Sequence, residues 1–347
     1  RRPPRSTQSR SSAASDVYKR QTIYNAFYNN FNYKQNILMT HSVMFHHFHD
    51  DFHLPSQGSL SASEFDFMIS WLRDRYDILD AQEYIDRFLS QTLKNTDICL
   101  SFDDALKCQY DIALPVLKKN NISAFFFVYS SAFSDNPDFL EIFRYFRTNK
   151  FDSVDEFYNY FFDFLIQNDK GEYLSQQSQY SSLGNYASAF PFYTENDKWF
   201  RYLRDQYLGN EKYTNVMLEI ISDKGEDINE INKNLWIRED ELLKIHENGH
   251  VVGLHSYSHP TQMSKLTADQ QLKEYQQNFT HLSKVLKTSE ITSMSHPCGD
   301  YNMDTLSLLK GMGIQIGFRS NMGVKEIRSP LEIPREDHAN VFKEMKQ

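Results

Sequence analysis

The chain has only three cysteines among its 347 residues, Cys99, Cys108 and Cys298, and none has CxxC spacing. Three cysteines are too few for the disulfide framework of a small secreted domain. Their low number is consistent with a protein of a reducing compartment. No stretch approaches the roughly 20 consecutive apolar residues of a membrane-spanning helix. No signal peptide is recognisable at the start. These absences predict a soluble protein, which we expect in the cytoplasm unless a native N-terminus carrying an export signal is missing.

Residues 1–21 differ in composition from the rest of the chain. They hold six of the 37 Lys and Arg, one of the 46 Asp and Glu, and almost nothing that can enter a core. We interpret them as a non-native leader, with a basic nucleic-acid-binding tail as the alternative. The remaining residues have 31 basic and 45 acidic side chains, a net charge of about −14. Such an acidic chain repels a phosphate backbone, so we do not expect a nucleic acid partner.

The pattern of apolar residues predicts the fold class. From about residue 38, short apolar runs alternate with amphipathic helices, which is typical of parallel βα units. Capping boxes at Ser61 and Thr267 mark the starts of two of these helices. The expected strands are residues 37–45, 76–79, 98–102, 124–128, 251–254, 291–295, 314–318 and 331–333. About seven strands that alternate with helices indicate a closed or partly closed α/β barrel.

The strand pattern is interrupted once, between residues 130 and 237. This segment is rich in Phe, Tyr, Asn and Asp and shows helix-like pieces without a strand rhythm. It is far longer than an ordinary loop, so we expect a helical insertion with its own small core. The chain then divides into a leader (1–21), a first barrel part (22–129), the insertion (130–237) and a second barrel part (238–347).

Two of the expected strands end in residues suited to metal-dependent chemistry. Polar residues at the C-terminal ends of barrel strands point into the mouth where ligands bind. Asp103 and Asp104 follow the strand at 98–102, although one of them could simply cap the next helix. His255 and His259 follow the strand at 251–254. Their spacing of four predicts two imidazoles on one face of a helical turn, which suits two ligands of one metal ion.

A third strand end forms a tight turn. Residues 295–301 have the sequence SHPCGDY, in which Pro297 and Gly299 force the chain to bend. Such a turn can leave backbone N–H groups unpaired and directed at the mouth.

The order of these motifs resembles the NodB-like polysaccharide deacetylases, carbohydrate esterase family 4. The segments ICLSFDDALKCQYDIALPVLKKNNISAFFFV and ENGHVVGLHSYSHPTQMSKLT are similar to that family over whole βα units. The resemblance covers roughly residues 38–129 and 238–345. It implies a distorted (β/α)7-type barrel with a helical insertion, and a hydrolase that removes N-acetyl groups from an amino-sugar-containing glycan.

The resemblance also implies roles for the polar strand ends. Asp103 falls on the family's catalytic base, and Asp104, His255 and His259 fall on its metal ligands. Two imidazoles and one carboxylate leave open positions, which is typical of a catalytic zinc site, so Zn²⁺ is the expected cofactor.

Two further groups follow from the same resemblance. The backbone N–H of Cys298, held in the turn made by Pro297, is expected to contact the oxyanion. The family uses a histidine near the C-terminal end to protonate the leaving amine, and His338 is the candidate, although its surrounding motif differs from the usual one.

The chain departs from the family pattern at two places. The family's third motif has an Arg two residues before the proline, where this chain has Ser295. Arg335 or Arg319 could supply the missing charge from another strand end. The second departure is a histidine cluster, in which His46 or His47 either contacts the substrate or belongs to a solvent-facing loop; its members are His41, His46, His47, His49 and His53.

Other functions are compatible with the same motifs. A deformylase or a cyclic-amide hydrolase would keep this site, and a non-catalytic carbohydrate-binding barrel would use the aromatic insertion to stack on sugars. The aromatic residues of the insertion either form only its core or also cover the barrel mouth. In the second case the substrate would be restricted to a short or lipid-linked glycan. The expected partner in every deacetylase case is an N-acetylated carbohydrate.

Overall fold

The computed structural model describes residues 41–56, 58–134, 139–184, 186, 193–232, 235–323 and 327–346. The predicted leader, 1–21, and the start of the first predicted strand lie outside these residues. Among the described residues, no helix is both long and apolar enough to cross a bilayer.

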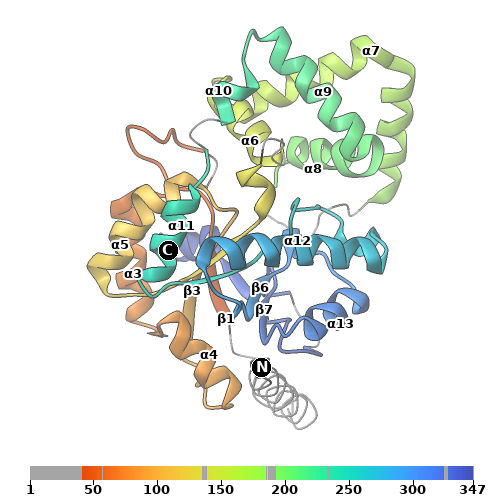
Figure 1. Cartoon of the computed structure of the whole chain (residues 1–347). Coiled ribbons are helices and arrows are strands. Elements are labelled where there is room, and N and C mark those ends of the chain that lie inside the picture. The colour runs from red at the N-terminus through yellow and green to blue at the C-terminus, as the bar shows by residue number, and fades with distance from the viewer. Residues whose placement is uncertain are drawn as a thin grey trace, which may run out of the picture.

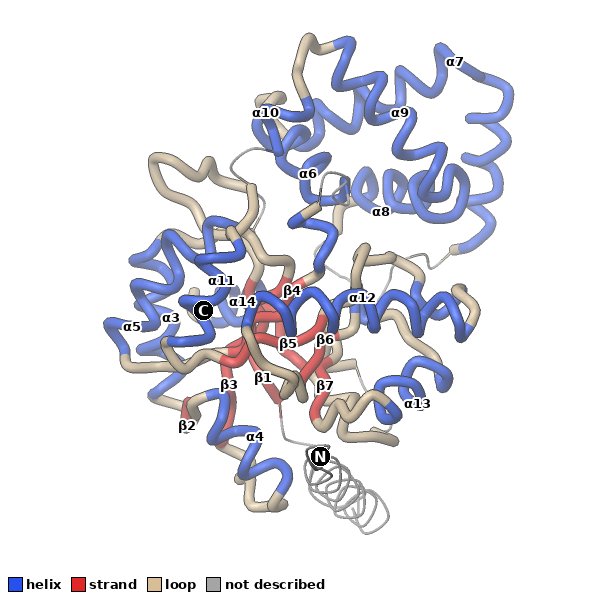
Figure 2. The backbone as a smooth tube through the Cα atoms, viewed as in Figure 1, coloured by secondary structure: helices blue, strands red, loops and turns tan. Residues whose placement is uncertain are grey.

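Parallel strands form the centre of the molecule (Figure 2). Their order across the sheet is β7-β6-β5-β4-β3-β1-β8, and the short β2 pairs with β3 outside this path. The strands are β1 (His41–Phe45), β2 (Asp77–Ile78), β3 (Asp97–Asp103), β4 (Phe125–Val128), β5 (Val251–Leu254), β6 (Ser293–Ser295), β7 (Ile316–Phe318) and β8 (Arg335–Asp337). The predicted barrel class is thereby confirmed.

The barrel is closed by a short connection between β7 and the residues just before β8. Phe318 at the end of β7 forms an isolated parallel bridge with Ile333, and β8 follows at once and pairs with β1. The prediction of a last strand at 331–333 is therefore wrong in position. Leu331 and Ile333 are apolar and buried, but the strand itself is the polar segment that starts at Arg335. The buried Arg335 side chain has polar partners inside the barrel, which the hydrophobic pattern does not indicate.

Helices cover the outside of the sheet (Figure 1). Both predicted capping boxes are present: Ser61 and Glu64 close the first turn of α3, and Thr267 and Gln270 that of α12. The barrel helices are α3 (Ala62–Arg73), α4 (Ala81–Leu89), α5 (Leu114–Asn120), α11 (Glu239–Glu247), α12 (Ala268–Leu286), α13 (Met303–Gly311) and α14 (His338–Glu344).

Aromatic side chains fill the lower part of the barrel interior. Phe125 and Phe127 of β4 lie against Phe318 of β7, with ring centroids 5.1 and 5.4 Å away. Helix α4 adds the fully buried Tyr84 to the same cluster. Because α4 lies at the opposite end of the barrel from the helices between β4 and α11, the mouth is left on the side of those helices (Figure 2).

The helices between β4 and α11 form a separate group above the barrel (Figure 1). They are α6 (Phe139–Asn149), α7 (Val154–Leu183), α8 (Glu195–Tyr202), α9 (Gly209–Asp223) and α10 (Ile228–Asn232). Their aromatic residues pack on one another, as where Phe161 contacts Phe200 at 5.1 Å between ring centroids. The buried Tyr158 hydroxyl also donates to Asp197 across α7 and α8. The aromatic residues of this group thus pack on one another, and the same apolar cluster continues into the barrel.

Gly253 sets the spacing between β5 and β6 and gives a test of the barrel packing. A Cβ at this position would lie 2.5 Å from Ser293 Oγ and 2.7 Å from Phe127 Cε1. We expect Gly253→Ala to destabilise the protein by about 1–3 kcal/mol through overpacking. Thermal unfolding measures this as a Tm lower by several degrees. Gly311→Ala is the control, since a Cβ there meets nothing within 4 Å; equal Tm values for the two variants would contradict the packing argument.

Candidate metal centre and catalytic site

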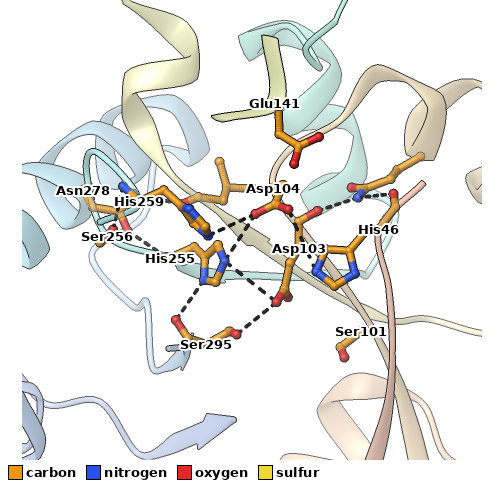
Figure 3. A network of polar contacts seen from close by, with 12 residues as sticks. His46, Ser101, Asp103, Asp104, Glu141, His255, Ser256, His259, Asn278 and Ser295 are labelled. Carbon is orange, nitrogen blue, oxygen red and sulfur yellow. Dashed lines mark hydrogen bonds and ion pairs between the residues drawn. The ribbon is translucent and has the colours of Figure 1, made fainter. Parts of the chain in front are cut away.

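The polar strand ends meet at one rim of the barrel (Figure 3). Asp103 is the last residue of β3, His255 directly follows β5, and Ser295 is the last residue of β6. Because β3, β4, β5 and β6 are consecutive parallel neighbours, their C-terminal ends lie side by side. The barrel topology thus brings together residues that are almost two hundred positions apart in sequence.

Asp104, His255 and His259 form a compact triad. Their ligand atoms lie within 4.8 Å of one another, and all three side chains are buried. The Asp104 Oδ1 atom lies 3.4 Å from the Nε2 atom of each histidine. The three residues predicted as metal ligands are therefore adjacent, with one carboxylate oxygen facing two imidazole nitrogens.

The orientation of His255 suits metal binding. Its Nδ1 atom lies 2.9 Å from the Ser295 carbonyl oxygen, which can only accept, so Nδ1 carries the proton. The lone pair of Nε2 then faces the triad, as is usual for metal-bound histidines. His259 is fully enclosed, and burial lowers its pKa to about 4, so its imidazole is neutral.

The chemistry of this triad fits a divalent cation. Asp104 Oδ1 is buried and makes no hydrogen bond. Burial alone would raise the pKa of Asp104, but the nearby His259 and His255 lower it below its ordinary value, so the carboxylate is charged. An unsatisfied anionic oxygen beside two imidazole nitrogens is a donor set that zinc and similar ions prefer. Asp104, His255 and His259 can therefore hold a metal ion.

Asp103 is fixed by an arginine from another strand. The Arg335 guanidinium contacts both carboxylate oxygens of Asp103, at 2.7 and 2.6 Å, and also donates to Ser295 Oγ at 2.7 Å. Arg335 is 0% exposed. Burial raises the pKa of Asp103, but the attraction of Arg335 and His255 outweighs it and leaves that pKa below its ordinary value. Arg319 instead supplies its backbone carbonyl to Arg335.

The loop that carries both histidines is not a helical turn, and that prediction is wrong. Ser256 and His259 have positive φ values of 67° and 52°. The carboxylate of Glu274 accepts hydrogen bonds from the backbone N–H groups of Tyr257 and Ser258, at 3.0 and 2.8 Å. These bonds replace helical ones and turn both imidazoles toward Asp104. Glu274 was missed in the sequence because it lies on the predicted surface of α12.

Asn278, one turn further along α12, also orients this loop. Its Oδ1 accepts from the His255 N–H at 2.9 Å, and its Nδ2 donates to Val128 O at 2.9 Å and Ser130 Oγ at 2.7 Å. The side chain is fully buried. An amide with all these partners holds the end of β4 and the start of the histidine loop together, and no motif in the sequence marks it.

Backbone strain is concentrated at this rim. Asp104 has φ 80°, in addition to the two residues of the histidine loop, and Cys298 has φ 51°. Such conformations are costly for residues other than glycine and cluster at functional sites. Asp104 caps no helix, because it lies in a turn and the next helical residue is Lys107. The alternative in which one of the two aspartates is a helix cap is thus not supported.

Cys298 lies in the predicted tight turn, Pro297–Gly299. Its neighbours Gly299 and Asp300 donate their N–H groups to His296 O and Pro297 O. In the described part of the chain, the Cys298 N–H has no such acceptor. The φ of 67° at Gly299 favours glycine in this turn, and a Cβ would also lie 3.0 Å from Ser320 Cβ. The turn therefore has a backbone donor to offer, as the oxyanion prediction requires.

The two histidines after β1 have different surroundings. His46 Nε2 lies 3.9 Å from Asp104 Oδ2, and its side chain is 24% exposed. His47 donates to Glu141 at 2.7 Å. Burial lowers the pKa of His47 to about 4, so it is neutral. Glu141 comes from α6 and points toward the triad (Figure 3). The sequence gives no signal for Glu141, because no motif marks it within the segment predicted as the insertion.

His338 lies away from these groups. Its Nε2 is 2.6 Å from the Gly58 carbonyl oxygen, its Nδ1 is 3.3 Å from the Met44 carbonyl oxygen, and its ring stacks on Phe45. Among the described residues, no hydrogen bond or ion pair joins His338 to the triad or to Asp103. Its predicted catalytic role stays a prediction.

One protein family model matches this chain. The polysaccharide deacetylase family model matches residues 90–145 and 212–317, which include the two aspartates, both histidines and the Pro297 turn. No curated protein sequence is significantly similar to the chain.

Two solved structures share the fold. The Streptococcus pyogenes deacetylase PplD, in complex with acetate, has a TM-score of 0.50 at 14% identity, covering 86% of this chain and 91% of its own. IcaB from Ammonifex degensii has a TM-score of 0.51 at 15% identity, covering 85% and 90%.

The ion pair between Arg335 and Asp103 can be tested through stability. Arg335→Met leaves Asp103 charged and unpaired inside the barrel, which we expect to cost about 3–5 kcal/mol at neutral pH. The cost falls at lower pH, because the unpaired Asp103 has a raised pKa and takes up a proton that the wild-type carboxylate does not. Tm measured from pH 7 down to about 4.5 reports the difference between the two proteins.

Arg319→Met is the matched control for this experiment. Its side chain makes no ion pair with Asp103 among the described residues, so we expect a smaller loss of Tm without that pH dependence. A destabilisation by Arg335→Met that is the same at every pH would contradict the pairing.

Proposed function

Because the chain belongs to the polysaccharide deacetylase family, hydrolases that cleave amide bonds of N-acetyl sugars, we propose that it removes acetyl groups from an amino-sugar-containing glycan in a metal-dependent reaction. The observation that supports this most directly is the buried Asp104–His255–His259 triad beside the arginine-held Asp103. A carbohydrate-binding barrel has no need of a charged carboxylate next to an unsatisfied ligand set.

Each group at the rim has a defined task in this proposal. A divalent ion, which we take to be Zn²⁺, supplies Lewis acidity toward the acetyl carbonyl and a lowered pKa for water when bound by the triad. Asp103, anionic and oriented by Arg335, accepts the proton of the attacking water. The Cys298 N–H donates to the oxygen that becomes negative in the tetrahedral intermediate. Asp103 thereby serves as the general base.

His46 is the histidine best placed to protonate the leaving amine. It lies at the end of β1 on the other side of Asp104 from His255, and it is partly exposed to the mouth. His338, by contrast, has both ring nitrogens directed at backbone carbonyls. Glu141 holds the adjacent His47 and so steadies the loop that carries His46. We therefore assign the acid role to His46 and a structural role to His338.

Release of acetate distinguishes this proposed activity from the alternative hydrolase activities. PplD has been solved in complex with acetate, and acetate is the product that we expect here. A deformylase acting through the same residues would release formate, and a cyclic-amide hydrolase would release neither acid. Assay of both acids with N-acetylated and N-formylated amino sugars distinguishes the three activities.

The metal requirement gives a direct test of the triad. We expect about one equivalent of zinc per chain by elemental mass spectrometry, and loss of both zinc and acetate release after dialysis against a chelator. His255→Ala removes one of three ligands and should abolish both. The control His246→Ala changes a histidine on α11 and should keep metal and activity. Full activity in a chelator-treated protein that contains no metal would contradict the proposed metal dependence.

The assignment of His46 predicts a dependence on the leaving group. His46→Ala should lower kcat/KM for an N-acetyl sugar by about 10²–10⁴-fold, the usual contribution of a general acid. An aryl acetate ester, whose leaving group needs no proton, should be affected much less. His338→Ala is expected to lower the Tm while affecting both substrates alike. If His338→Ala shows the leaving-group effect and His46→Ala does not, the assignment is wrong.

A further inference from the structure

A cavity of about 740 Å³ lies between the insertion and the loop that follows β5. Its walls come from α6, from the segment 204–215 and from residues 257–266. His259 is among the lining residues, so the cavity opens beside the metal triad. We propose that this cavity binds a short, uncharged oligosaccharide segment next to the acetylated sugar. This inference rests on the proposed deacetylase function and names the part of the substrate that the insertion recognises.

The cavity wall carries two positive and two negative side chains. Arg204 makes a two-point contact with Asp205, at 2.6 and 2.8 Å. The other two charged residues of the wall are Lys265 and Glu211, which are exposed and opposite in sign. A site for a phosphorylated or carboxylated glycan needs a cation that is free to pair with the ligand. A wall without net charge, in which the partly buried Arg204 is already paired, favours a neutral ligand.

The remaining wall has the chemistry of a sugar site. The cavity is lined by uncharged hydrogen-bonding groups, among them Asn210, Thr214, Asn215 and Gln262. Amide and hydroxyl side chains both donate and accept, which matches the hydroxyl groups of a sugar. The cavity therefore offers polar partners for a ligand that carries no charge.

Tyr257 adds an aromatic surface on a fixed backbone. Its N–H donates to Glu274 at 3.0 Å, and its carbonyl accepts from the Ser131 N–H at 2.8 Å. The ring is half-buried, and it contacts no other ring among the residues that the structure describes. An aromatic side chain held in this way presents an apolar face and a hydroxyl at little entropic cost. Tyr257 is thus placed to pack on a sugar ring near His259.

The size of the cavity limits the length of the bound segment. Pockets of about 300–1,000 Å³ typically enclose one small ligand. A cavity within this range holds a few sugar rings, and the acetylated ring itself must reach the triad at its edge. The enzyme should therefore gain rate from a few neighbouring sugars and nothing from further chain length.

Kinetics on a length series tests this inference. With N-acetylglucosamine and its oligomers, we expect kcat/KM to rise at least about tenfold from the monomer to the tetramer and then to level off, since binding of remote sugars stabilises the transition state. Thr214→Trp fills the cavity from α9 and should bring the tetramer-to-monomer ratio close to one. Phe67→Ala, which removes an exposed aromatic ring on α3 outside the cavity, should keep the wild-type ratio.

Two further variants distinguish loss of sugar binding from loss of folding. Asn210→Ala and Asn215→Ala change exposed residues of α9, and each should lower the ratio without lowering the Tm. An unchanged ratio in Thr214→Trp and in both asparagine variants, with wild-type Tm values, would overturn the proposal. So would a wild-type enzyme that cleaves the monomer and the tetramer equally well.

Binding measurements separate this inference from the function on which it rests. In Asp103→Asn protein, which should not turn over substrate, calorimetry with the N-acetylglucosamine tetramer should show binding that Thr214→Trp removes. If no oligomer releases acetate yet this binding pattern holds, the deacetylase proposal fails and the cavity proposal stands. Tighter binding of a hyaluronan tetrasaccharide, which carries carboxylates, or no binding of the neutral tetramer, would refute an uncharged ligand.

Discussion

The buried ion pair between Arg335 and Asp103 is the interaction on which the site depends. Arg335 of β8 is paired with Ser42 of β1, and Ser42 is paired with Cys99 of β3. Cys99 comes four residues before Asp103 in β3. The long side chain therefore runs along the barrel interior and contacts Ser101 on its way to the carboxylate. A charge in this position is stable only with a partner, and so each member of the pair fixes the other.

This arrangement also accounts for Ser295. The family places an arginine at that strand end, whereas here the cation is Arg335 of β8. The Ser295 hydroxyl lies between Arg335 and Asp103. Its Oγ atom is 2.7 Å from Arg335 Nη2 and 3.2 Å from Asp103 Oδ2. The small side chain leaves room for the guanidinium. Independently of its side chain, Ser295 orients His255 through its backbone carbonyl. The positive charge beside Asp103 thus comes from β8 and not from the position of Ser295.

The sequence predicted most of the barrel and the residues of the triad, because both depend on local patterns. Apolar alternation identifies β3 and β4, a capping box identifies α3, and the polar ends of strands identify Asp104 and His255. It could not predict the contacts of Glu274 or Glu141, since a carboxylate on a helix surface has the same pattern whether it faces water or another loop. The segment from His255 to His259 was misjudged because its positive φ values depend on hydrogen bonds from α12. The strand that starts at Arg335 was misplaced because the Arg335 side chain is buried through its ion pair with Asp103 and not through apolar neighbours.

The place of the insertion in the chain decides what it can contact. It leaves the barrel at the end of β4, and β4 lies between β3 and β5, whose ends carry Asp104 and His255. A segment inserted there starts within the rim of the metal centre, so its first helix reaches the site directly, as Glu141 does. The same helix also reaches the loop after β1, because Glu141 accepts a hydrogen bond from His47. Sugars bound in the cavity beside His259 would extend from the triad on the side opposite His46.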